Sequence, residues 1–107
     1  MKNPLGNMGN ILKQAQAMQA KMAKVQEEAS TKMVTGTAGG GSVTVTANGA
    51  MQLVGIVIDH EVVKSGDVEM VQDLVMAASN DALRKAREMM ADEMKSVTGG
   101  MNVPGLT

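Results

Sequence analysis

Apolar side chains recur near the start of the chain at alternating intervals of three and four residues. The series is Met8, Ile11, Ala15, Met18, Met22, Val25 and Ala29. Such heptad spacing places all of its members on one narrow stripe of a helix. That stripe is too narrow to cover a globular core, but it suits a helix lying along another helix. We therefore predict a long helical arm over residues 7–31, beginning near Asn7, whose seam consists of Met8, Ile11, Ala15, Met18, Met22 and Val25. The spacing leaves open whether this seam pairs within one subunit or between two.

The length and composition limit the class of protein. A chain of 107 residues corresponds to a single domain, here residues 1–107, and a second copy would help it to bury enough surface. The chain has no cysteine, which excludes disulfides. No apolar run approaches the ~18 residues of a membrane span, so we expect a soluble intracellular protein without a membrane partner. Aromatic residues are absent, which removes the usual stacking platforms of single-strand and RNA binders.

The middle of the chain has the pattern of a three-stranded meander over residues 33–59. Residues 42–47 alternate hydroxyl and apolar side chains, as in a half-buried strand. Asn48-Gly49 then predicts a two-residue hairpin turn, because both residues tolerate positive φ. In the next run one face would carry Met51, Leu53 and Val57, and the other Val54, Ile56 and Ile58. A strand that is apolar on both faces needs two covering layers, one of which a partner subunit could supply.

A second long helix is expected over residues 67–97. The acidic side chains of Asp67 and Glu69 would stabilise its N-terminus, where the helix dipole is positive. Gly99-Gly100 would terminate the helix. Residues 98–107 have no periodicity and are predicted to form a flexible tail. The fold class is therefore α+β: an α-β-β-β-α subunit with a three-stranded antiparallel sheet and two long flanking helices, and the seam of the first helix suggests that the functional unit is an oligomer.

Charge is unevenly distributed along the chain, although the net charge is only −1. Residues 1–26 contain Lys2, Lys13, Lys21 and Lys24 and no acidic residue. Residues 33–83 contain six acidic residues against Lys64 alone, and basic character returns at Arg84, Lys85 and Arg87. A balanced chain of this kind can still present a local surface that binds anions. Asp81 with Lys85, and Arg84 with Glu88, are spaced for ion pairs within a helix.

The residue types required for catalysis are almost absent. His60 is the only histidine, and its neighbours Asp59 and Glu61 do not have a recognised metal-ligand spacing. The glycine-rich stretch 36–42 lacks the lysine of a phosphate-binding loop and precedes a strand, so we interpret it as a hairpin turn. We therefore expect no enzymatic activity, no cofactor, no metal and no small-molecule substrate.

Several segments, in order, resemble those of the YbaB/EbfC family of bacterial nucleoid-associated proteins. They are residues 9–22, Val34-Thr35-Gly36 with the glycine turn, Val43-Thr44-Val45 with Asn48-Gly49, Asn80-Asp81-Ala82 with Arg84-Lys85, and Gly99-Gly100-Met101. The resemblance covers nearly the whole chain. It implies a tweezer-like homodimer that binds double-stranded DNA in the bacterial cytoplasm with low or modest sequence specificity, affecting nucleoid organisation and gene expression.

The resemblance also implies that the projecting helices contact DNA. In this chain it points to Lys13, Lys21 and Lys24 on the first helix and to Arg84, Lys85 and Arg87 on the second. Two departures from the family pattern are an apolar third strand, where some relatives carry basic residues, and His60, where proline is common. The first departure argues against DNA contact by the sheet. The alternative hypothesis is a dimeric scaffold that binds another protein through its heptad seam and methionine-rich surface.

Overall fold

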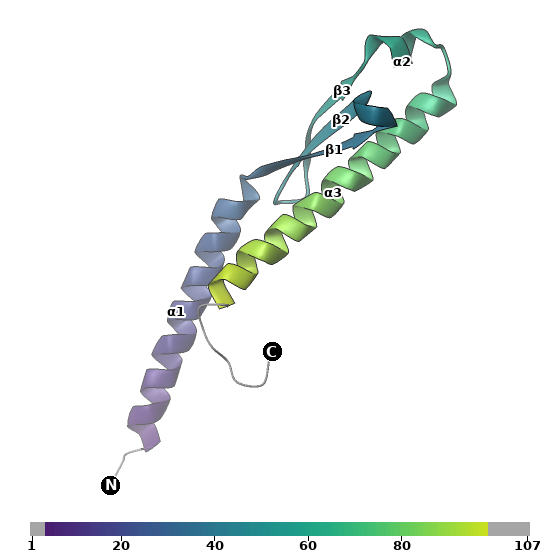
Figure 1. Ribbon diagram of the computed structural model, residues 1–107. Coiled ribbons are helices and arrows are strands. Elements are labelled where there is room, and N and C mark those ends of the chain that lie inside the picture. The colour runs from purple at the N-terminus through teal and green to yellow at the C-terminus, as the bar shows by residue number, and fades with distance from the viewer. Residues whose placement is uncertain (1–3, 99–107) are drawn as a thin grey trace.

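The computed structural model describes residues 4–98, with side chains for residues 8–97, as an elongated molecule of 80 × 25 × 17 Å (Figure 1). Its elements are α1 (Pro4–Ser30), β1 (Met33–Ala38), the 3-10 turn η1 (Gly39–Gly41), β2 (Val43–Asn48), β3 (Leu53–Ile58), α2 (His60–Lys64) and α3 (Val68–Thr98). The predicted α-β-β-β-α order is confirmed. The short helix α2 was not expected from the sequence. The predicted tail lies, from residue 99 onward, outside the described residues.

The core is formed where the sheet lies on α3. The strand order is β1-β2-β3 and both pairings are antiparallel. Alternate residues of β2, namely Val43, Val45 and Ala47, are fully buried, as their period of two predicts. They pack against an alanine stripe on α3 formed by Ala78, Ala82 and Ala86. The four-residue spacing of these alanines keeps them on one helix face, and their small size lets the sheet lie close to the helix.

Gly36 is the point at which β1 approaches α3 most closely. A Cβ atom placed on Gly36 would lie 2.5 Å from the backbone oxygen of Ala78 and 2.8 Å from Cα of Ala82, and closer still to the nitrogen of Ala82. All three are backbone atoms, so no side-chain rotation could relieve the contact. Glycine is therefore required here by the packing of the strand on the helix.

The glycine-rich stretch forms a turn between β1 and β2, as predicted. Gly39, Gly40 and Gly41 all have positive φ, at 63°, 69° and 97°. Residues with a Cβ rarely adopt three such conformations in succession. The glycine run is thus explained by backbone geometry, without invoking a bound phosphate.

The prediction of a two-residue turn at Asn48-Gly49 was wrong. The loop spans residues 49–52, and the positive φ falls on Met51, at 62°. Asn48 instead acts through its side chain, because its Oδ1 accepts hydrogen bonds from the backbone N–H groups of Ala50 (2.9 Å) and Gln52 (3.1 Å). Asn favours turns by this mechanism as well as by tolerating positive φ.

The predicted assignment of faces in β3 also requires correction. A bulge at Thr46/Ala47 pairs Gly55 with Thr46 and Leu53 with Ala47, so β3 has one extra residue at Val54. Directly opposed residues share a face. Leu53 therefore lies on the same face as Ala47, toward α3, and not with Val57 as the simple alternation predicted.

Among the described residues, neither face of β3 is fully covered. Leu53, Val54, Ile56 and Val57 are 44%, 47%, 48% and 66% exposed. The strand lies at the edge of the sheet, while α3 lies across β1 and β2. The described part of a single copy thus does not supply the two covering layers expected from the sequence.

The two long helices begin differently. α1 begins at Pro4 and not at Asn7, which lies inside the helix; proline is well suited to a first helical turn because its missing N–H would have no partner there. α3 begins as predicted beside Asp67, whose Oδ1 accepts a hydrogen bond from the N–H of Met70 (3.0 Å). That contact is an N-cap, which satisfies one of the free amides of the first turn.

Candidate nucleic-acid interface

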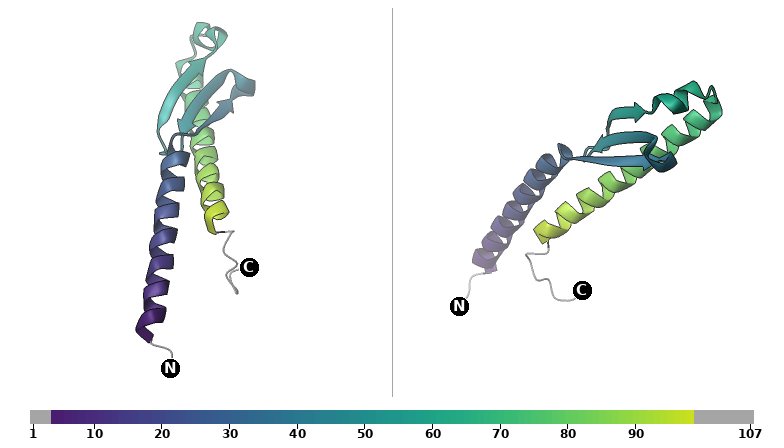
Figure 2. Two further views of the ribbon diagram at one scale, coloured as in Figure 1. Left: turned by 90° about the vertical axis from the view of Figure 1, so that its left-hand side faces the viewer. Right: turned by 45° about the horizontal axis from the view of Figure 1, so that its top comes forward.

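α1 projects from the sheet as an arm, and α3 runs antiparallel beside only part of it (Figures 1 and 2). The seam residues nearer the sheet are covered: Ala29 is 1% exposed, and Met18, Met22 and Val25 are half-buried. The same seam is exposed at Met8 and Ile11. The sheet end of the seam therefore pairs within the subunit, with α3, while the far end has no cover among the described residues.

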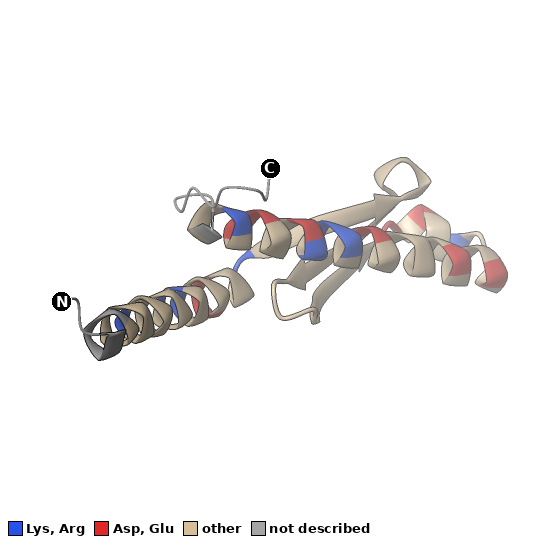
Figure 3. Cartoon of the chain, turned by 90° about the horizontal axis from the view of Figure 1, so that it is seen from below, with Lys and Arg blue, Asp and Glu red and all other residues tan. Residues whose placement is uncertain are grey.

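Three lysines, Lys13, Lys21 and Lys24, lie along this arm, and Figure 3 shows Lys and Arg positions of the chain in blue. Lys13 and Lys24 each follow a seam residue by two positions, which is about 200° around a helix, and they share one side of α1. Lys21 lies between them at the flank of the seam. All three are exposed, and none of their side chains forms a hydrogen bond or ion pair with another described residue.

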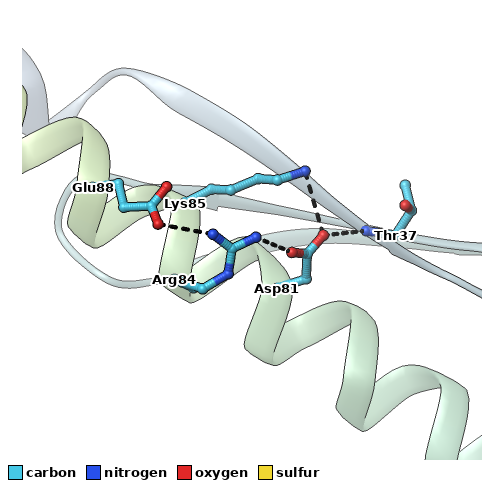
Figure 4. Close-up of polar contacts among 5 residues, drawn as sticks. All are labelled: Thr37, Asp81, Arg84, Lys85 and Glu88. Atoms are coloured by element: carbon cyan, nitrogen blue, oxygen red, sulfur yellow. Dashed lines mark hydrogen bonds and ion pairs between the residues drawn. The ribbon is translucent and has the colours of Figure 1, made fainter.

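The cationic side chains Arg84 and Lys85 of α3 differ from the lysines of α1, because they form ion pairs with acidic side chains (Figure 4). Arg84 donates to Asp81 Oδ1 at 2.7 Å and to Glu88 Oε1 at 2.8 Å. The Nζ of Lys85 lies 3.3 Å from Asp81 Oδ2. The predicted pairings of Asp81 with Lys85 and of Arg84 with Glu88 are confirmed. Arg84 and Lys85 thus offer less unneutralised charge to an anion than the lysines of α1.

Asp81 also joins the helix to the sheet. Its Oδ2 accepts a hydrogen bond from the backbone N–H of Thr37 in β1 at 3.1 Å. The hydrogen bond from Arg84, followed by that from Thr37, lowers the pKa of Asp81 from 3.8 to about 2. The hydrogen bond to Asp81, and after it the hydrogen bond to Glu88, raises the pKa of Arg84. Asp81 therefore remains ionised near neutral pH and holds both neighbouring cations.

Arg87 is exposed and has no ion pair or hydrogen bond among the described residues. Of the six predicted DNA-contacting residues, four are therefore unpaired in this structure, three on α1 and one on α3. Sequence reasoning missed the role of Asp81 as a bridge to β1, since its partner Thr37 is 44 residues away. It also missed the ion pair between Lys32 and Glu93, which joins the connection between α1 and β1 to α3.

The remaining candidate features do not form a second site. His60 is the exposed first residue of α2. Between residues 4 and 98 there is no group of three or more His, Asp or Glu side chains able to hold a metal ion. No helix in the described part of the chain is both long enough and apolar enough to cross a membrane.

Comparison with known proteins places this chain in a family. The model of the YbaB/EbfC DNA-binding family matches residues 4–101. A nucleoid-associated protein of Caldanaerobacter subterraneus subsp. tengcongensis is 55% identical over 100 residues, covering 94% of this chain and 90% of that protein. One from Thermoanaerobacter pseudethanolicus is 54% identical with the same coverage. The structure resembles that of an uncharacterized protein from Helicobacter pylori, with a TM-score of 0.60 and 28% identity, covering 73% of this chain and 90% of that one.

Proposed function

Since this chain belongs to the YbaB/EbfC DNA-binding family, we propose that it binds double-stranded DNA as a homodimer through Lys13, Lys21 and Lys24 of α1. The observation that supports this most directly is that these lysines are exposed and unpaired on α1, and that residues 1–26 of the chain contain no acidic group. The relatives are named nucleoid-associated proteins, and for this chain we propose association with the nucleoid in the bacterial cytoplasm. The family is described as DNA-binding, not as an enzyme family, and nothing in the comparisons favours the scaffold hypothesis.

The chemistry of these lysines suits the phosphate backbone. Lys13 and Lys24 are eleven residues apart, which is about 17 Å along a helix. Ammonium groups on long flexible side chains bind phosphates as point charges and release condensed counterions. Contacts of this kind carry little base information, so we expect low or modest sequence specificity. Arg87, the unpaired cation of α3, would add a further contact, and broad binding of this kind would affect nucleoid organisation and gene expression.

Homodimerisation is supported by the uncovered strand β3. An apolar strand exposed on both faces at a sheet edge promotes association with other chains. A second copy that covers Leu53, Ile56 and Val57 would provide the missing layers. The dimer would carry two arms, and six α1 lysines.

The test is a fluorescence-anisotropy titration of labelled duplex DNA between 50 and 200 mM salt. Six phosphate contacts predict a slope of about −5 in log K against log salt, or a loss of roughly 10³-fold over that range. Lys13, Lys21 and Lys24 are replaced together by Gln. The matched control replaces Arg84, Lys85 and Arg87 by Gln, so that both variants lose the same charge. Each variant is first checked for its oligomeric state.

The α1 variant should lose most of the salt-dependent affinity, while the α3 variant should lose much less, because Asp81 and Glu88 already compensate two of its cations. The opposite ranking would refute the assignment of the interface to α1. Absence of binding by the wild-type protein at low salt would refute the DNA-binding proposal.

A further inference from the structure

The end of α1 that lies nearest the sheet is held by contacts from two other parts of the chain (Figure 1). The backbone N–H of Gly49, in the loop between β2 and β3, donates to the carbonyl oxygen of Lys32, just after α1, at 3.1 Å. The side chain of Lys32 forms an ion pair with Glu93 of α3. Ala29, in the last turn of α1, is only 1% exposed. These four residues, together with Met90 of α3, are called the arm root below.

Gly49 has no room for a side chain. A Cβ atom placed on it would lie 2.8 Å from the carbonyl carbon of Ala29, 2.8 Å from the sulfur of Met90, and closer still to the carbonyl oxygen of Ala29. The side chain of Met90 can rotate away, but the backbone of Ala29 cannot. Gly49 does not have a positive φ, so its backbone conformation does not require glycine. The close approach of the loop to α1 is what requires it.

The loop that carries Gly49 is fixed to the sheet. Asn48 Oδ1 accepts hydrogen bonds from the N–H groups of Ala50 and Gln52, and Asn48 Nδ2 donates to Gln52 Oε1 at 3.2 Å. The backbone N–H of Asn48 also donates to the carbonyl oxygen of Gln52 at 3.0 Å. The strand before the loop, β2, is buried against α3. A side chain at Gly49 would therefore displace α1 and not the loop.

A displacement at the arm root would be carried along the whole arm. The hydroxyls of Ser30 and Thr31 donate to backbone oxygens three residues earlier, at 2.6 and 2.8 Å, so the last turn of α1 is closed and the helix would move as a unit. Relieving the contact with Ala29 requires about 1 Å, and over one turn of about 5 Å this is a tilt of roughly 10°. Lys13 lies sixteen residues before Ala29, about 24 Å along the helix, and would move by roughly 4 Å. That is about one step between successive phosphates of a DNA strand, which are about 3.4 Å apart along the axis.

We propose that Gly49 is a positioning residue for the arm. Its lack of a side chain, together with the ion pair between Lys32 and Glu93, sets the direction in which α1 projects. That direction determines how well the two arms of the dimer match the phosphates of the duplex. Gly49 acts through Ala29 and does not touch DNA. The inference rests on the proposed DNA binding, and it gives the Asn48-Gly49 pair a role other than that of a two-residue turn.

The direction of the arm is measured first, in the full-length protein without DNA. Spin labels are attached at Gln16→Cys on α1 and Ala77→Cys on α3, because both residues are exposed and the chain has no cysteine of its own. Labelled chains are diluted with unlabelled ones, so that pulsed EPR measures only distances within one chain. Gly49→Ala should shift or broaden the distance distribution by about 3 Å. An unchanged distribution would overturn the proposal.

The affinity of the same variant for labelled duplex DNA is then measured by fluorescence anisotropy. Gly49→Ala should bind about tenfold more weakly than the wild type, because arms that no longer match the duplex cannot both bind in register. The control is Val45→Ala, which removes buried core atoms and lowers Tm but adds no atom at the arm root. It should keep the wild-type distances and affinity. Equal loss of affinity in both variants, or no loss in Gly49→Ala, would overturn the role of Gly49 in binding.

A charge swap tests the arm root even if Gly49→Ala does not fold. The side chains of Lys32 and Glu93 are 51% and 29% exposed, so both positions tolerate either charge. Lys32→Glu places two carboxylates together, and it should displace the arm and weaken DNA binding. Lys32→Glu with Glu93→Lys restores the ion pair at the wild-type net charge, and it should recover both the distances and the affinity. If the single variant leaves the arm in place, or the double variant does not restore it, the arm root does not set the direction of α1.

Failure of the proposed function gives a different result from failure of this inference. If the wild type does not bind DNA at low salt, the DNA-binding proposal is refuted, and with it the role of Gly49 in binding. The distances, which are measured without DNA, still decide whether Gly49 sets the direction of the arm.

Discussion

Replacing Gly36 by Ala should destabilise the protein far more than one methyl group would normally do. The new Cβ would lie no more than 2.8 Å from three backbone atoms of Ala78 and Ala82, whereas carbon atoms in ordinary contact are 3.5–4.0 Å apart. Since neither partner can rotate away, β1 would have to move about 1 Å from α3. That movement would loosen the packing of Val45 on the alanine stripe.

The expected magnitude follows from two opposing effects. Overpacking of a well-filled core costs about 1–3 kcal/mol, and the contact with rigid backbone places Gly36→Ala near the upper limit. The substitution recovers about 0.5–1 kcal/mol by restricting the unfolded chain. The net loss is about 2 kcal/mol, which corresponds to a decrease in Tm of about 8 °C for a chain of this size.

The matched control is Gly55→Ala in β3. A Cβ at Gly55 would meet only the Cβ of Thr46, at 4.0 Å, so this variant should be as stable as the wild type or slightly more stable. Both melting curves are recorded by circular dichroism at one protein concentration, because association shifts Tm. If Gly36→Ala melts at or above the temperature of Gly55→Ala, the proposed close approach of β1 to α3 is incorrect.

Two further predictions concern Asp81 and β3. Because the folded pKa of Asp81, about 2, lies below its ordinary 3.8, its ionised form stabilises the protein above about pH 4, and this contribution is lost as the pH falls toward 2. The stability difference between the wild type and Asp81→Asn, measured by urea denaturation, should therefore shrink between pH 4 and pH 2; a constant difference would show that the charge is not responsible. Val57→Lys should yield a monomer in analytical ultracentrifugation if β3 forms the dimer interface, because this side chain is 66% exposed in the single chain. Thr35→Lys, on the opposite edge strand β1, should remain dimeric, and dimers of both variants would place the interface elsewhere.

The charged side chains of α1 and α3 show what a charge pattern can and cannot predict. The absence of acidic residues around Lys13 and Lys21 is visible in the sequence and explains why they are unpaired, whereas Lys24 is unpaired although Glu27 and Glu28 follow it by three and four residues. The i,i+4 spacing likewise revealed the pairing of Arg84 with Glu88. The hydrogen bond from Thr37 to Asp81 was not predictable, because it depends on β1 lying across α3. That contact helps to keep Asp81 ionised between two cations.

The sequence by itself determined the features that depend on neighbouring residues. The heptad period sets the stripe on α1, alternation sets the buried face of β2, and Asp67 sets the start of α3, because each arises from local backbone geometry. Only the tertiary structure decided how far α3 covers the seam and why Gly36 must be glycine. It also located the bulge that moves Leu53 to the face toward α3. These features depend on contacts between elements that are far apart in sequence, and a local sequence pattern carries no information about such contacts.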